Sequence, residues 1–166
     1  SNVAKIKRLK LPGIIVKKLE DGVKKSDLII LCTPMSEYKN LILKMNKFLL
    51  PKTIITDVGS SKLESSRIIK KFVRKDVSWI QSHPIAGSEV SGPEHGRHDM
   101  FEKKWCVLIK EKNTKKKCLL VLKIFWNKIG SKVAVMTSEK HDKIFSITSH
   151  LPHLIAYNLV KTAQDF

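Results

Sequence analysis

Short apolar runs alternate with longer segments of helical periodicity along this chain, and no other feature constrains its fold as much. The runs lie in DLIILCTP, TIITDVGS, VSWIQSHP, WCVLIK and KVAVM, and apolar runs of this length are typical of strands buried on both faces of a parallel sheet. Between them, apolar residues at helical spacing predict helices at about 35–49, 61–74 and 115–129. This order of elements predicts an α/β fold built on a doubly wound parallel sheet.

The two ends of the chain differ from its middle. Residues 137–166 contain no further strand pattern, and Thr137 or Ser138 is a candidate helix cap, so we place a domain boundary after residue 136. The opening SNVAKIKRLKLPGIIV is typical of the helix and loop that follow the second strand of a Rossmann-like sheet. The G-x-G-x-x-G motif expected in a dinucleotide-binding example is absent from the sequence. We therefore expect an N-terminally truncated sheet, with the first half of the nucleotide site upstream of Ser1.

The formal net charge of +17 raises the question of a polyanionic partner. Nearly all of the excess is lysine, spread along the chain, whereas reading of bases and bidentate contacts to phosphate favour arginine. We therefore favour a solvated lysine-rich surface over nucleic-acid binding. A basic Rossmann-like module that binds polyanions without catalysis is the alternative from another functional class.

Composition also bears on the compartment. No apolar run reaches the roughly 18 to 20 residues that a membrane helix needs, and the first residues lack the pattern of a signal peptide. The three cysteines are odd in number and form no C-x-x-C pair, which indicates reduced thiols. We expect a cytoplasmic protein with no membrane partner.

Polar residues follow three of the predicted strands, where ligands bind in open α/β sheets. These clusters are Thr33-Pro34, the stretch 57–61, and Ser82-His83. Taken separately, the first is also explained as a turn, the second as a turn with a helix cap, and His83 as a loop histidine. Their common position favours a site, in which an imidazole titrating near neutrality accepts a hydroxyl proton as the same carbon loses hydride. Ser60 is placed to hydrogen-bond His83 or that hydroxyl.

Four segments, DLIILCTP, TDVGSSK, SHPIAGSEVSG and SHLPHLIAY, resemble the prephenate and arogenate dehydrogenases of tyrosine biosynthesis, in order and in spacing. The resemblance implies a partial dinucleotide-binding domain at 1–136 and the first helix of an all-helical dimerisation domain at 137–166. It implies oxidative decarboxylation of prephenate to 4-hydroxyphenylpyruvate, or alternatively of arogenate to tyrosine, with NAD or alternatively NADP as cofactor. It also implies a homodimer for the full-length protein, and we expect the 166-residue chain itself to be inactive.

The resemblance also assigns residues. His83 matches the catalytic histidine, and Ser60 matches the serine that orients it beside the nicotinamide. The remaining positions are substrate-side Ser88, Glu89, His150 and His153, and cofactor-side Thr33, Pro34, Gly59 and Ser60. For His150 and His153, an H-x-x-H metal site with His141 or Asp142 and a role in packing or capping are the alternatives. We favour the substrate pocket and expect no metal.

Overall fold

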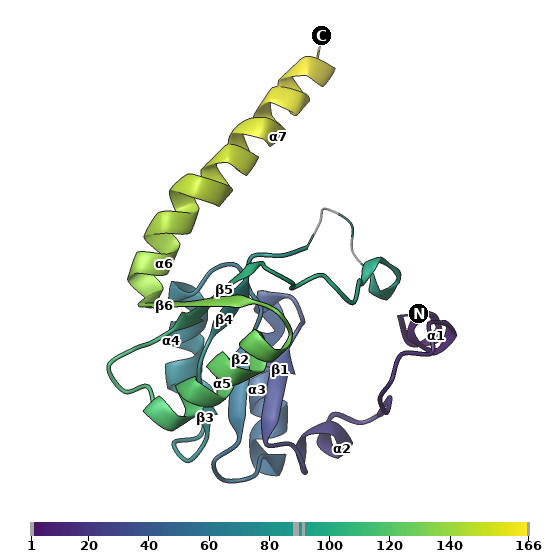
Figure 1. The fold of residues 1–166 in the computed structure, drawn as a ribbon, viewed down its shortest axis with the longest axis vertical. Helices are drawn as coiled ribbons and strands as arrows, with labels where there is room; N and C mark the ends of the chain where they lie inside the picture. Colours follow the sequence, from purple (N-terminus) through teal and green to yellow (C-terminus); the bar gives the residue numbers. More distant parts are fainter. Residues whose placement is uncertain (1, 88–89, 91, 166) are drawn as a thin grey trace.

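The computed structural model describes residues 2–87, 90 and 92–165 (Figure 1). The strands are β1 (Leu28–Leu31), β2 (Ile54–Asp57), β3 (Ser78–Trp79), β4 (Ser82–Pro84), β5 (Trp105–Ile109) and β6 (Lys132–Met136). The α-helices are α1 (Asn2–Arg8), α2 (Leu19–Val23), α3 (Tyr38–Met45), α4 (Leu63–Phe72), α5 (Lys116–Lys128), α6 (Ser138–Phe145) and α7 (Leu151–Gln164). Single turns of 3₁₀ helix cover Met35–Glu37, Asn46–Phe48 and Pro93–His95, and a π-helical turn covers Ser146–His150.

The strands form two three-stranded sheets, with orders β1-β2-β3 and β4-β5-β6. In the first sheet all pairs are parallel, and Leu31 lies opposite Asp57. In the second sheet β5 and β6 are parallel, but β4 runs antiparallel to β5, with His83 opposite Val107. The predicted α/β architecture is confirmed, whereas the expectation of an exclusively parallel sheet is wrong at the β4–β5 pair.

The segment VSWIQSHP, predicted as one strand, is divided between the two sheets. Its first half pairs with β2, and the Ile80 amide still donates to the Ile55 carbonyl at 3.0 Å. Two residues later the Ser82 amide donates instead to the Asp57 carboxylate at 3.3 Å, and the chain continues beside β5. The parallel pairing stops because β2 ends at Asp57, whose side chain replaces the next backbone acceptor.

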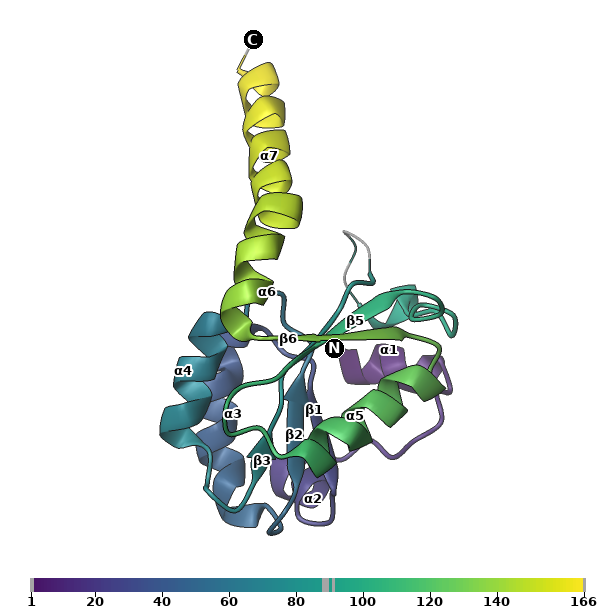
Figure 2. The same ribbon diagram turned by 60° about the vertical axis from the view of Figure 1, so that its left-hand side comes forward.

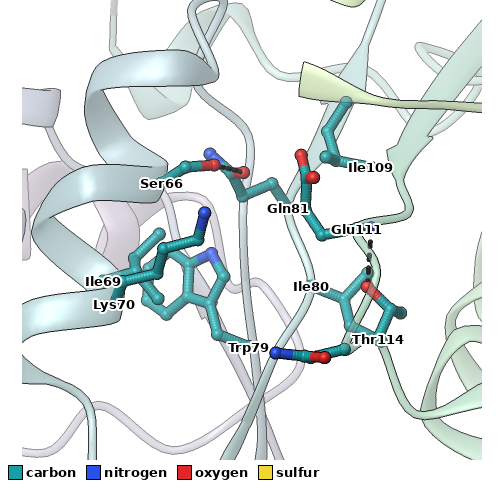
Figure 3. Close-up of a pocket in the computed structure, with 10 residues that line it drawn as sticks. Ser66, Ile69, Lys70, Trp79, Ile80, Gln81, Ile109, Glu111 and Thr114 are labelled. Atoms are coloured by element: carbon teal, nitrogen blue, oxygen red, sulfur yellow. Dashed lines mark hydrogen bonds between the residues drawn. The ribbon is translucent and has the colours of Figure 1, made fainter. Parts of the chain in front are cut away.

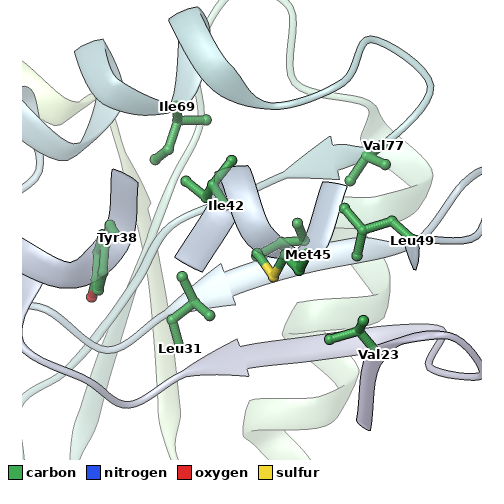
Figure 4. Packing of buried hydrophobic residues seen from close by; sticks show 9 residues of the cluster. Val23, Leu31, Tyr38, Ile42, Met45, Leu49, Ile69 and Val77 are labelled. Carbon is green, nitrogen blue, oxygen red and sulfur yellow. The ribbon is translucent and has the colours of Figure 1, made fainter. Parts of the chain in front are cut away.

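Helices cover both faces of the first sheet, as Figures 1 and 2 show. Neighbouring residues of β2 point to opposite faces. Ile55 joins a core cluster with residues of α3 and α4 (Figure 4), and Ile54 joins a second cluster with residues of β5 and α5. In the first cluster Tyr38 and Ile42 of α3 are fully buried. The periodicity of the sequence therefore predicted the layers, although α3 is shorter than the helix expected at 35–49 because a 3₁₀ turn flanks each end.

The carboxyl-terminal segment projects from the sheets as a long helical arm (Figures 1 and 2). It begins where the sequence predicted a cap, since the Thr137 hydroxyl accepts the Lys140 amide at 3.3 Å. The π-helical turn separates α6, which packs against α4 and β5, from α7, which buries none of its residues. Among the described residues, no helix is both long enough and apolar enough to cross a membrane.

Candidate active site

A fully buried polar cluster lies where β2 ends. The Asp57 carboxylate accepts hydrogen bonds from Lys62 Nζ at 2.8 Å, Tyr38 Oη at 3.1 Å, the Gly59 amide at 3.2 Å and the Ser82 amide at 3.3 Å. Lys62 Nζ also donates to the Ser82 carbonyl at 2.6 Å, and the Lys62 and Asp57 side chains are completely buried. Burial lowers the pKa of Lys62, while the charge of Asp57 opposes this shift. The cluster therefore ties the residue that precedes His83 to the end of β2.

His83, in β4, faces the helical arm. Its Nδ1 atom lies 2.8 Å from Nε2 of His141, and Nδ1 of His141 lies 2.7 Å from an oxygen of Asp142. Phe145, one turn further along α6, stacks edge-on against His83 with ring centroids 4.9 Å apart. Within the described residues, Nε2 of His83 has no hydrogen-bond partner. His83 is thus held through one ring nitrogen only.

Both imidazoles of this pair favour the neutral form. Burial lowers the pKa of His83 to about 3, and neighbouring His141, Lys62 and His150 act in the same direction against the carboxylate of Asp142. Burial also lowers the pKa of His141, although its hydrogen bond to Asp142 opposes the shift. His83 is therefore a neutral imidazole at physiological pH, the form that can accept a proton.

Asp142 has a second role, as the cap of α4. Its carboxylate accepts the amides of Lys62 and Leu63, each at 2.9 Å, and these are donors at the start of that helix. Partial burial acts to raise the pKa of Asp142, but these amides and the His141 ring together lower it. The interpretation of residues 57–61 as a turn with a helix cap is thus half correct, because Asp57 binds the Gly59 amide while α4 is capped from α6.

His141 and Asp142 were missed as site residues by the sequence analysis, which considered them only as metal ligands. One signal was present: the predicted cap at Thr137 starts a helix on which His141 and Phe145 are four residues apart and so share a face. Nothing local indicated that this face meets β4. In the part of the chain that the structure describes, no three His, Cys, Asp or Glu side chains are grouped so as to hold a metal ion.

The remaining predicted residues that the structure describes differ in their exposure. Thr33 and Pro34 follow β1 and are exposed, and Ser60 follows β2 and is exposed. Among the described residues, no hydrogen bond joins Ser60 to His83, whose Nδ1 is paired with His141 instead. Half-buried His150 influences the pKa of His83, whereas His153 is exposed on α7. Ser88 and Glu89 lie outside the described residues.

A cavity of about 240 Å³ lies elsewhere, between α4 and the end of β5 (Figure 3). Trp79, Ile69 and Gln81 contribute to its wall. None of the predicted site residues lines it. The cavity is therefore separate from the centre around His83.

Comparisons with known proteins identify the family of the chain. The family described as "Prephenate dehydrogenase, nucleotide-binding domain" matches residues 4–135, and the one described as "Prephenate dehydrogenase, dimerization domain" matches residues 137–165. The chain is 30% identical to a cyclohexadienyl dehydrogenase of Zymomonas mobilis, over 95% of this chain and 54% of the relative.

Two solved structures are also similar to the chain. Prephenate dehydrogenase of Aquifex aeolicus in complex with hydroxyphenyl propionate and NAD+ has a TM-score of 0.87 and 30% identity, over 96% of this chain and 56% of that one. Arogenate dehydrogenase of Synechocystis has a TM-score of 0.75 and 25% identity, over 89% and 51%. The chain thus spans about half the length of the relatives that it matches.

Proposed function

Because the chain belongs to the prephenate dehydrogenase family, we propose that it forms part of an NAD-dependent dehydrogenase that converts prephenate to 4-hydroxyphenylpyruvate by oxidative decarboxylation. The observation that carries this proposal is His83, a neutral and mostly buried imidazole held through Nδ1, whose Nε2 has no partner among the described residues. Oxidation of a ring alcohol requires a group that accepts the hydroxyl proton, and a neutral imidazole with a free ring nitrogen is such a group.

In the proposed reaction His83 accepts the proton of the ring hydroxyl while the carbon that bears it loses hydride. Bound NAD+ supplies the acceptor for that hydride. Loss of carbon dioxide then makes the ring aromatic and leaves an oxygen that takes the proton back from His83. One proton is therefore borrowed and returned, and His83 ends the cycle neutral.

The residues proposed to contact the cofactor suit its position. Thr33 and Pro34 follow β1, and Gly59 and Ser60 follow β2, so all four lie at the carboxyl ends of neighbouring parallel strands. A Cβ atom at Gly59 would lie 2.9 Å from the Met35 sulfur and 3.1 Å from an oxygen of Asp57, so a larger residue here would require the Met35 side chain to shift. NAD is favoured because the Aquifex relative was solved with NAD+, and NADP is the alternative.

The substrate side is proposed to include His150 and His153 together with Ser88 and Glu89. His150 is near enough to His83 to affect its pKa, which supports the assignment of His150. Arogenate is the alternative substrate, since the Synechocystis relative is an arogenate dehydrogenase. We also propose a division into a nucleotide-binding part at 1–136 and the start of a dimerisation part at 137–166, a homodimer through the latter, and a cytoplasmic location.

The test is His83→Asn in the complete natural protein that contains these residues, assayed with prephenate and with arogenate and with each cofactor. We expect kcat to fall by about 10²- to 10⁴-fold, the usual contribution of general base catalysis, with cofactor binding retained. His98→Asn, at an exposed loop histidine, is the matched control and should leave kcat unchanged. A loss below about threefold for His83→Asn would remove this residue from the mechanism.

A further inference from the structure

We propose that Asp142 and His141 are positioning residues that fix His83 as its Nδ1–H tautomer, so that Nε2 is the nitrogen that accepts the substrate proton. The tautomer assignment does not depend on the proposed function, whereas its catalytic consequence rests on that function. The three side chains form a continuous hydrogen-bonded row that runs from the start of α4, through α6, to β4.

The donor in each hydrogen bond can be assigned by starting from the Asp142 carboxylate. An ionised carboxylate only accepts, and the Asp142 carboxylate already accepts the amides of Lys62 and Leu63. Nδ1 of His141 must therefore donate to it across the 2.7 Å contact. A neutral imidazole carries one N–H, so Nε2 of His141 is left as an acceptor.

The same reasoning identifies the donor and acceptor nitrogens of His83. The acceptor Nε2 of His141 lies 2.8 Å from Nδ1 of His83, so Nδ1 of His83 must donate. Nε2 of His83 then bears a lone pair, and it is the ring nitrogen without a partner among the described residues. Burial and a neighbouring lysine keep His141 neutral, which excludes the reverse order that an imidazolium would allow.

This arrangement serves a proton acceptor in two ways. It prevents the inactive tautomer, in which Nε2 would carry hydrogen and could not accept a proton, and it aims the ring by anchoring its far side. When Nε2 takes the hydroxyl proton, the ring becomes an imidazolium whose Nδ1–H still donates to Nε2 of His141, while Nδ1–H of His141 donates to the Asp142 carboxylate. The positive charge of the His83 imidazolium is thus connected through His141 to the negative charge of Asp142.

Long-range proton–nitrogen NMR on the 166-residue chain with ¹⁵N-labelled histidine tests the tautomers directly, without substrate or cofactor. Near neutral pH we expect hydrogen on Nδ1 and none on Nε2 for both His83 and His141. Hydrogen on Nε2 of His83 would overturn the proposal.

Asp142→Asn is the sharpest variant, because the amide keeps the shape and retains one oxygen for the amides of α4. The side-chain nitrogen that this substitution introduces can donate to Nδ1 of His141, so Nε2 of His141 would carry the hydrogen and donate to Nδ1 of His83. We therefore expect the hydrogen of His83 to move to its Nε2. Glu139→Gln makes the same chemical change at an exposed position of the same helix and should leave the tautomers as they are. An unchanged His83 tautomer in Asp142→Asn would show that Asp142 does not set it.

His141→Phe is the second variant and guards against poor folding of the first. Phenylalanine retains an aromatic ring beside Phe145 but offers no acceptor to Nδ1 of His83. We expect the Nε2–H form of His83 to become detectable in a variant whose circular dichroism spectrum matches the parent. A folded variant with His83 wholly in the Nδ1–H form would overturn the role of His141.

Activity of the complete natural protein separates this proposal from the proposed function. In Asp142→Asn we expect kcat to fall at least about tenfold with KM changed less than about threefold, because the base is in the wrong tautomer while the binding groups remain. An unchanged kcat in Asp142→Asn would refute the catalytic consequence. If the parent protein oxidises neither prephenate nor arogenate, the proposed function fails, while the NMR result still decides the tautomers.

Discussion

Helices α5 and α7 are nearly equal in length, with 13 and 14 residues, yet only one of them is covered. α5 buries Leu119, Leu122 and Trp126 against the second sheet, packs Cys118 and Phe125 beside them, and exposes its opposite side. α7 exposes 59% of Leu154 and 65% of Leu159 and buries nothing. The contrast teaches that apolar content alone does not bury a helix: both helices expose some apolar residues, but α5 sets one face against a sheet, whereas α7 is apolar on several sides and needs further surfaces.

The largest expected difference in stability is between a charge buried at the end of β2 and a charge on the exposed arm. Asp57→Ala leaves Lys62 buried without its partner, so we expect a loss of about 3–5 kcal/mol in the free energy of unfolding. Asp165→Ala, at an exposed acid beyond α7, should change this free energy by less than about 0.5 kcal/mol. Urea unfolding followed by circular dichroism measures both variants. Equal losses of unfolding free energy in the two variants would contradict the contrast between the buried pair and the exposed arm.

The next expected difference in stability is between a leucine of α5 and a leucine of α7. Leu122→Ala opens a cavity under α5, where the side chain is completely buried, and should cost about 2–5 kcal/mol. Leu154→Ala on α7 removes a side chain that is already largely solvated, and we expect less than about 0.5 kcal/mol. The same unfolding experiment decides, and a cost above about 1 kcal/mol for Leu154→Ala would mean that α7 is covered in solution.

A smaller difference concerns the pH dependence of stability. The pKa of His83 is lowered from its ordinary 6.5 to about 3, so between these values the unfolded chain binds a proton that the folded chain does not. The stabilisation by neutral His83 is therefore complete above pH 6.5 and is lost as the pH falls toward 3. Partial exposure of the ring limits the expected loss between pH 7 and pH 5 to about 1 kcal/mol.

Paired variants isolate this effect from the other groups that titrate near His83, namely His141, Lys62, His150 and Asp142. His83→Asn should flatten the dependence of the unfolding free energy on pH. His153→Asn, at an exposed histidine of α7, should leave it unchanged. Parallel curves for the parent and His83→Asn would show that His83 is not held neutral.

The smallest expected effect on stability is in the arm itself. Replacement of Leu154 and Leu159 by glutamine, a good helix former, should change the free energy of unfolding by less than about 0.5 kcal/mol. The exposed apolar surface should nevertheless drive self-association of the 166-residue chain, which these substitutions reduce. Light scattering over a range of concentrations measures this, and identical scattering by the parent and the double variant would argue against association through α7.

Local pattern was sufficient to predict most of the elements and to single out His83. Apolar runs and helical spacing predicted β1, β2, β5, β6 and the layers around them, because burial on both faces demands such runs. The cap was predicted at Thr137 or Ser138, and it lies at Thr137; such a cap is visible in sequence because it is a contact between residues three apart. Four segments together, among them the one around His83, were sufficient to indicate the family that residues 4–135 match.

The tertiary structure alone decided how that histidine is held. The contact of His83 with His141 spans 58 positions of sequence, and that of Asp142 with the start of α4 spans 80. The division of VSWIQSHP between two sheets depends likewise on Asp57, which takes the Ser82 amide 25 positions away. Periodicity reports which face of an element is apolar, but it carries no information on which polar side chain of a distant element meets it. The partner that orders the His83 tautomer therefore became visible only once α6 was placed against β4.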